Sequence, residues 1–267
     1  MKHLISLTLV LLTFTFAHAS LVIVNGLSHE HTVQNGLKSQ GSIIIKNTSE
    51  TPRRAKIYKT DVVHKCDGQT TFIEGSDRER CNSEWTLLSD NEIIIPSQQS
   101  YTLTYELNPG EDVQGVGSYW GVIMVEEIND LDTTSPQRGV TVTSLIRYAI
   151  QIISNFDSEP VKDLEIAGVD IDTTKENNLI AVSVNNNGNF MLKPIMILEL
   201  YNDLGEQVYR TEIPYQKVYP GFCKLFELSI NEVPQGTYNG IIVADCGDEN
   251  IYGMNIEIDV PTPKTKI

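Results

Sequence analysis

The stretch GVGSYWGVIMVEEI, residues 115–128, decides the fold of this chain. It runs for eleven residues without a charge and then carries Glu126 and Glu127. Side chains alternate between the two faces of a strand, so two apolar sets are expected. They are Tyr119, Gly121, Ile123 and Val125 on one face, and Trp120, Val122 and Met124 on the other. One set fills a sandwich core, and the other is covered either by a second domain or by a partner protein.

The segments around this stretch are short and interrupted by turn residues. Residues 101–107 alternate Tyr101, Leu103, Tyr105 and Leu107 on one face, which is typical of a half-buried strand. Further strands are predicted at residues 41–47, 55–63 and 140–153, with a stapled loop or small hairpin at residues 64–84. The second half shows seven short apolar runs separated by Asn, Gly, Asp or Pro, the spacing of a β-sandwich.

The polar, proline-containing segment at residues 154–163 is the best domain boundary. The prediction is therefore an all-β chain of two tandem immunoglobulin-like antiparallel β-sandwiches, at residues 20–154 and 155–267. No convincing amphipathic helix is present in either half.

The first residues have the pattern of a cleaved signal peptide. Lys2 and His3 precede an apolar run at residues 4–16, and Ala17-His18-Ala19 fits the small-residue cleavage rule. Residues 1–19 are predicted to be removed, which leaves Ser20 as the mature N-terminus. The apolar run is short for a membrane span. We therefore expect an exported protein without membrane insertion.

Charge and cysteines narrow the function classes. The formal net charge of −15 argues against nucleic acid or an anionic membrane surface as the main partner. In an oxidising compartment the simplest pairing of the four cysteines is local, Cys66 with Cys81 and Cys223 with Cys246. A disulfide between Cys66 and Cys81 would close a loop between them and stabilise the fold by roughly 3 kcal/mol. Zinc binding is the alternative, but no CxxC or close Cys/His pair supports it.

The motifs tested for chemistry point away from an enzyme. His29 and His31 share a strand face, but polar edge residues explain them better than a metal site. The acidic runs NDLDTT (129–134) and DCGDEN (245–250) lack the calcium-loop pattern of an EF-hand. Asn47 opens a formal glycosylation sequon. No nucleophile elbow, phosphate loop or HExxH motif is present, so no catalytic residue, cofactor or metal is predicted.

Three stretches carry a family resemblance. GSIIIKNTSETPRRAKIY (41–58), NEIIIPSQQSYTLTYEL (91–107, with Pro96 in register) and GSYWGVIMVEEI (117–128) resemble, in order, the N-terminal domain of periplasmic pilus-assembly chaperones, the PapD-like family. The second half, with VSVNNNG (182–188), KPIMILELYNDLGEQVY (193–209) and PQGTYNGIIVADC (234–246), resembles the second domain of WxL-interacting cell-surface proteins.

The resemblance implies strand donation to an incomplete partner sandwich. Residues 140–153 stand where the family's long edge strand lies, with Val140 and Val142 as donor side chains. Arg147 falls at the basic position of that strand and His31 at the basic position of the first strand, where the family grips the partner's C-terminal carboxylate. Trp120 is a further partner-contact candidate. Main-chain pairing would supply affinity and alternating pockets specificity.

Two functions follow as hypotheses. The first is a non-enzymatic periplasmic chaperone or assembly adaptor for another envelope, fibre or secreted protein, associated with the outer membrane or the cell surface. The second is a fixed structural subunit or scaffold of a cell-envelope or secretion complex. An enzyme with a distributed site is a third reading with little support.

Overall fold

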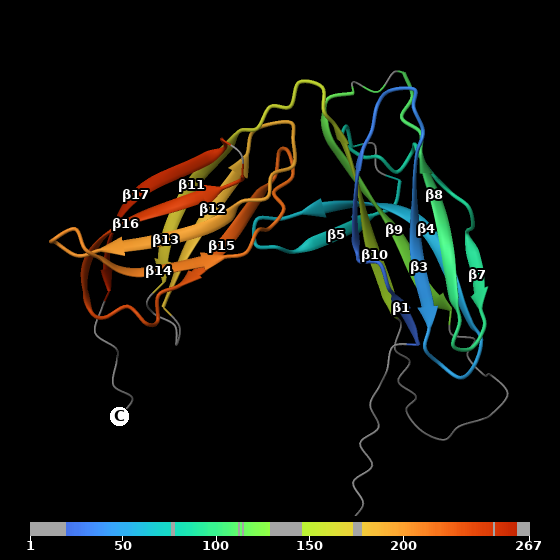
Figure 1. The fold of residues 1–267 in the computed structure, drawn as a ribbon, viewed down its shortest axis with the longest axis horizontal. Coiled ribbons are helices and arrows are strands. Elements are labelled where there is room, and N and C mark those ends of the chain that lie inside the picture. Colours follow the sequence, from blue (N-terminus) through green and yellow to red (C-terminus); the bar gives the residue numbers. More distant parts are fainter. Residues whose placement is uncertain are drawn as a thin grey trace, which may run out of the picture.

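The computed structural model describes residues 20–75, 78–111, 113, 115–128, 146–172, 178–247 and 249–260. Within these residues every regular element is a β-strand, and the strands form two sandwiches (Figure 1). The predicted all-β class with two tandem sandwiches is confirmed. None of the described residues belongs to a helix with the length and apolarity needed to cross a bilayer. The predicted signal peptide, Val140, Val142 and the acidic run at 129–134 lie outside the described residues.

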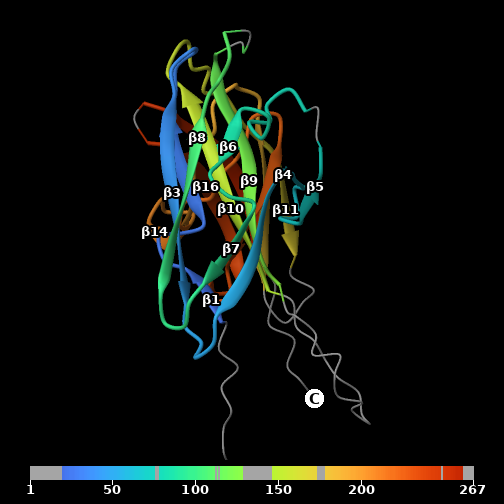
Figure 2. The same cartoon turned by 90° about the vertical axis from the view of Figure 1, so that its right-hand side faces the viewer.

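Two sheets form the first sandwich. One has the order β1-β3-β8-β6, and the other has the order β2-β10-β9-β4-β5, with β7 also paired to β4. Figure 2 shows the first sandwich in front of the second. The bounds are β1 Leu21–Ile23, β2 Ser28–Thr32, β3 Ser39–Asn47, β4 Arg53–His64, β5 Thr70–Ile73, β6 Thr86–Leu88, β7 Glu92–Ile95, β8 Ser100–Leu107, β9 Gly117–Ile128 and β10 Arg147–Phe156. All pairs are antiparallel except β2 with β10, which run parallel.

The second sandwich has the seven strands that its sequence predicts. One sheet has the order β11-β12-β15 and the other the order β14-β13-β16-β17. The bounds are β11 Leu164–Asp172, β12 Leu179–Asn186, β13 Ile195–Tyr201, β14 Gln207–Ile213, β15 Cys223–Ser229, β16 Gly236–Asp245 and β17 Ile251–Val260. The chain passes from β10 to β11 through residues 157–163, inside the predicted linker.

Strand β9 is buried on both faces, as the opening stretch predicts. It lies between β4 and β10 in the sheet. Tyr119, Ile123 and Val125 belong to the core of the first sandwich. Trp120, Val122 and Met124 belong to a separate cluster that includes Met191 and Tyr219 of the second sandwich. The second domain is therefore the cover that this face requires.

A buried asparagine ends an early strand in each sandwich. The Asn47 amide donates to the carbonyls of Thr51, Ile95 and Pro96, at 2.8–3.1 Å. The Asn186 amide likewise donates to the carbonyls of Phe190 and Val218, both at 2.8 Å. Each side-chain oxygen accepts from the backbone N–H two residues on. Asn47 is fully buried, so the sequon is inaccessible in the folded chain.

The cysteine pairing differs from the local pairing that the sequence suggests. Cys66 is bonded to Cys223, 157 residues away, with the two Cα atoms 4.8 Å apart. Cys81 and Cys246 are free thiols, and burial raises the pKa of both, that of Cys246 to about 11. The local prediction is wrong because β4 and β5 form a hairpin that carries Cys66 across to β15 of the second sandwich (Figure 1). The disulfide therefore joins the two domains.

Candidate functional site: the cleft between the sandwiches

Aromatic rings from both domains form the joint between the sandwiches. The Trp120 ring lies 4.6 Å from Tyr219 and 5.8 Å from Phe222, between ring centroids. The guanidinium of Arg78 lies 4.1 Å from the Trp120 ring, within range of a cation–π contact. His64, at the end of β4, stacks on Tyr219 at 4.7 Å and nearly parallel. Aromatic rings therefore pack at the centre of the joint, Arg78 and His64 lie beside them, and the disulfide between Cys66 and Cys223 links the two domains.

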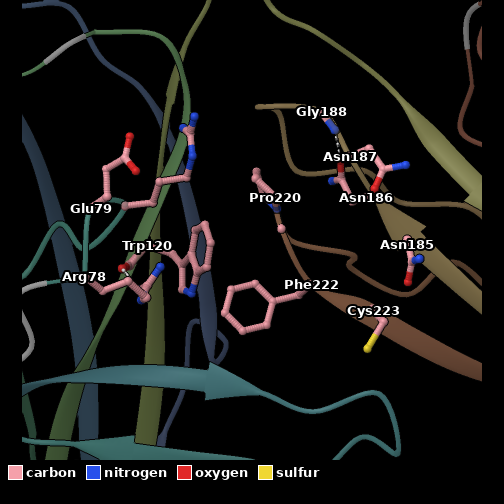
Figure 3. A pocket seen from close by; sticks show the side chains of 12 residues that line it. Arg78, Glu79, Trp120, Asn185, Asn186, Asn187, Gly188, Pro220, Phe222 and Cys223 are labelled. Atoms are coloured by element: carbon pink, nitrogen blue, oxygen red, sulfur yellow. Dashed lines mark hydrogen bonds between the residues drawn. The ribbon is translucent and has the colours of Figure 1, made fainter.

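A cavity of about 690 Å³ opens beside this joint (Figure 3). Arg78, Arg80 and Trp120 line it from the first sandwich, and residues 185–188 and 220–223 from the second. Figure 3 shows Trp120 and Phe222 facing each other across the domain boundary. Both arginines are engaged within the protein. Arg78 pairs with the buried Asp61, and Arg80 donates to the carbonyl of Val116 at 3.2 Å. Of the two arginines, only Arg78 therefore has a carboxylate partner among these contacts.

A second cavity of about 270 Å³ collects positive charge. We call it the lysine pocket, and its charged or titratable lining residues are His64, Lys65, Lys217 and Lys224, with Gln151 of β10 and Tyr219 beside them. None of the three lysines has a carboxylate within ion-pair distance among the described residues. Such a concentration of cations is unexpected in a chain with a net charge of −15.

Lys217 is the most enclosed of these cations. Its ammonium donates to the Ser28 hydroxyl of β2, and its distance to the Gln151 side-chain oxygen is 3.4 Å. The Tyr219 hydroxyl donates to the same Gln151 oxygen at 2.9 Å. Burial lowers the pKa of Lys217, and Glu30 opposes this shift. The half-buried Lys217 ammonium therefore has only neutral oxygens in contact among the described residues.

The pKa of His64 is lowered by burial and by the same positive charges of the lysine pocket. Its pKa is lowered to about 4, first by burial and then by Lys224, Arg78 and Lys217. Its Nε2 atom is buried and has no hydrogen-bond partner. His64 is therefore neutral at pH 7, and protonation would add charge to a region that already repels it.

Next to the lysine pocket, one edge of β10 has no paired strand among the described residues. β2 pairs with β10 only from Gln151 to Asn155. The Gln151 amide donates to the Leu27 carbonyl, on the β2 side, whereas the Ile146 carbonyl accepts from Glu127 of β9. Because backbone groups alternate between the two sides of a strand, the N–H and C=O groups of Arg147 and Ala149 face away from β9. No described strand pairs with them there, and we call this stretch, residues 147–150, the open edge.

The structure does not bring together the two predicted basic positions. Arg147 begins β10, and its Nε lies 2.9 Å from the Glu126 carboxylate of β9. His31 is opposite Ser154, seven residues further along β10, so about 23 Å separates the two positions. The His31 ring turns into the sandwich, 2.8 Å from the Tyr105 hydroxyl.

The Trp120 prediction also differs from the structure. Its side chain is fully buried under Tyr219 and Phe222, where it forms part of the domain joint. Lys217, Gln151 and Ser28 were missed as site residues. Their association depends on the angle between two domains, and no local pattern in the sequence encodes that angle.

Comparisons with known proteins find likeness in structure. No family model matches the chain, and no curated protein sequence matches it. A class 5 fimbriae chaperone, CfaA, matches at 14% identity with a TM-score of 0.49, over 91% of this chain and 100% of that one. The E. coli chaperone DraB matches at 13% identity with a TM-score of 0.43, over 90% of this chain and 98% of that one. A structure of Salmonella enterica SafA pilin in complex with the SafB chaperone matches at 12% identity with a TM-score of 0.46, over 91% of this chain and 99% of that one.

These solved structures contain pilus-assembly chaperones, the family that the first half of the sequence also resembles. With identities this low, they leave the partner and the activity to be argued from the cleft itself.

Proposed function

We propose that this chain is an exported, non-enzymatic binding protein that holds an extended segment of another envelope, fibre or secreted protein along the open edge of β10. The periplasm is the compartment we propose, with the outer membrane or cell surface as its place of association. The observation that supports this most strongly is the position of the lysine pocket at the end of an unpaired strand edge.

Main-chain groups supply the first part of the binding. Arg147 and Ala149 each offer an N–H donor and a C=O acceptor toward the cleft. An extended peptide that adds to such an edge gains backbone hydrogen bonds with little dependence on its sequence. This suits a protein that binds several partners or one partner in an unfinished state.

The lysine pocket supplies the second part. A strand that pairs with Arg147 and Ala149 meets the start of β2 at Gln151, where the Leu27 carbonyl already accepts the amide hydrogen. The partner chain must therefore turn or end at this point. A chain that ends there presents its α-carboxylate to the Lys217 ammonium, which has only neutral oxygens in contact. We therefore place the partner's C-terminus in the lysine pocket, in place of the Arg147 and His31 pair that the sequence suggested.

The test uses Ala149→Pro, which removes one open-edge N–H but no hydrogen bond to β9, because the N–H of residue 149 faces away from β9. Ala149→Ser is the matched control that keeps the N–H. Lys217→Met removes the most enclosed of the three lysine charges at similar length, and Lys46→Met, on an exposed position of β3, is its control.

Protein is isolated natively from its own cells, and co-purifying proteins are quantified by mass spectrometry. Substoichiometric partners that are lost with Ala149→Pro and Lys217→Met, but retained in both controls, support the proposal. Partners that stay with both variants at fixed stoichiometry contradict it and support a structural subunit instead.

A further inference from the structure

We propose that β2 is an acid-released cover on β10, held by a cluster of His29, His31 and Tyr105. The five residues of β2 occupy the edge of β10 that continues from the open edge. Their release lengthens that edge from residues 147–150 to residues 147–155. The consequence for binding rests on the proposed function, but the release itself does not.

The cluster is the inward anchor of β2. The burial of β2 alternates, so that Ser28, Glu30 and Thr32 are exposed while His29 and His31 face the sandwich. His29 Nδ1 lies 2.9 Å and His31 Nε2 lies 2.8 Å from the same Tyr105 hydroxyl oxygen. Tyr105 is 2% exposed and comes from β8 of the opposite sheet. Two imidazoles therefore replace the aliphatic side chains that usually dock a strand.

Both hydrogen bonds of the cluster are complete when the two rings are neutral. The Tyr105 hydroxyl donates its hydrogen to one bare imidazole nitrogen and accepts an N–H from the other ring. If the accepting ring gains a proton, both rings donate to the oxygen, and the hydroxyl hydrogen loses its acceptor. The second nitrogen of His29 is buried and has no hydrogen-bond partner.

No opposite charge within the described residues stabilises a protonated ring. Across from the histidines, β10 presents Ile152 and Ser154, and β3 presents Gly41 against the Tyr105 ring. Glu30 lies on the outward face of β2 and is 2.7 Å from Lys193 of the second domain. The pKa of His31 is lowered first by burial and then by His29, with no carboxylate among its influences.

The direction of the pH effect follows. A histidine whose pKa is lower in the docked state than in the released state stabilises docking at neutral pH. That contribution is complete above the ordinary value of 6.5 and is lost as the pH falls toward the lowered value. At about pH 5, a histidine that stays neutral while docked favours release by up to roughly thirty-fold.

Two amides report directly on β2. The Gln151 amide donates to the Leu27 carbonyl, and the Val33 amide donates to the Asn155 carbonyl. Hydrogen exchange of both is followed by NMR between about pH 7.5 and about pH 5, corrected for the intrinsic pH dependence of exchange. The Val218 amide, bonded to the Leu192 carbonyl in the second domain, is the internal control.

We expect the protection of Gln151 and Val33 to fall on acidification, by up to roughly thirty-fold, while Val218 keeps its protection. In His29→Gln/His31→Gln the drop should disappear, because glutamine donates and accepts hydrogen bonds without titrating. Unchanged protection in the wild type, or an equal drop in the double variant, overturns the proposal.

If the double variant does not fold, His64→Gln keeps the test decisive. His29, His31 and His64 are the only histidines after residue 19. A drop that persists in His64→Gln assigns the response to β2, and a drop that vanishes there assigns it to the domain joint and overturns the proposal. The measurement needs no partner, so its failure is separate from failure of the proposed function.

Discussion

Removal of the disulfide between Cys66 and Cys223 should loosen the joint between the domains. The bond closes a segment of 157 residues. The chain entropy that such a link removes from the unfolded state corresponds to roughly 5 kcal/mol at 25 °C. Each sandwich has its own core, and measured effects are usually smaller than this limit. We therefore expect Cys66→Ser/Cys223→Ser to lose about 2–5 kcal/mol.

The assay is thermal unfolding followed by calorimetry, with and without reductant. For a chain of this size, a loss of about 2–5 kcal/mol lowers Tm by roughly 4–20 °C. Reductant should lower the wild-type Tm to the value of the double variant and should leave the double variant unchanged. Peptide mapping without reduction should recover Cys66 linked to Cys223.

Cys81→Ser and Cys246→Ser are the matched controls, since both thiols are free in the structure. Each should be much milder than the double variant and should keep its response to reductant. The local pairing would give the opposite pattern, because Cys81→Ser would then act like Cys66→Ser. That result, or a wild-type Tm that ignores reductant, would refute the interdomain bond.

Three further perturbations test the packing and the electrostatics. Asn47→Ala leaves the carbonyls of Thr51, Ile95 and Pro96 without this donor, the Ile95 carbonyl in a buried site, and should cost about 2–4 kcal/mol in urea unfolding, with a similar loss for Asn186→Ala. Losses under about 0.5 kcal/mol would show that the two strand ends do not need these amides. Trp120→Ala removes the largest side chain of the domain joint and should cost about 3–5 kcal/mol, whereas unchanged stability would mean that the joint opens in solution. The lowered pKa of His64, about 4 against 6.5, means that the neutral ring stabilises the fold above pH 6.5 and that this stabilisation is lost toward pH 4. The shift corresponds to at most about 3 kcal/mol, and solvent screening at this half-buried site reduces it to roughly 1–2. In His64→Gln the difference in stability between these pH values should shrink by that amount, and an unchanged difference would contradict the assignment.

The sequence predicted the parts of the fold that depend on local alternation. The two faces of β9 were assigned correctly from the alternation of its side chains. Both alternating sets are apolar, which is the pattern of a strand that is buried on both faces. The seven strands of the second sandwich follow from the pattern of apolar runs and turns.

The site was less predictable because it forms between domains. Cys66 seemed closest to Cys81 along the chain, but a hairpin of β4 and β5 takes it to the other sandwich. Arg147 was predicted because it falls at the basic position of the edge strand in the family that the sequence resembles, yet Glu126 on the neighbouring strand pairs with it. Lys217 comes from a polar stretch without any motif, and only the angle of the domains places it beside Ser28 and Gln151.

The histidines of β2 show a different limit. Their shared face was evident from the sequence, and polar edge residues were the preferred reading. The parallel pairing of β2 with β10 turns that face inward, onto Tyr105. A polar side chain can therefore anchor a strand when it forms a hydrogen bond with a buried hydroxyl. Hydrophobic patterning in the sequence does not reveal such a contact.

The most direct test of the central claim is the amide exchange of β10 in the complex. Arg147 and Ala149 should exchange freely in the isolated protein and become protected when the partner is bound. Tyr148 and Ile150, which face β9, should be protected in both states. If Arg147 and Ala149 still exchange freely while the partner is bound, the partner does not pair with the open edge, and the account of this cleft as a strand-binding site is wrong.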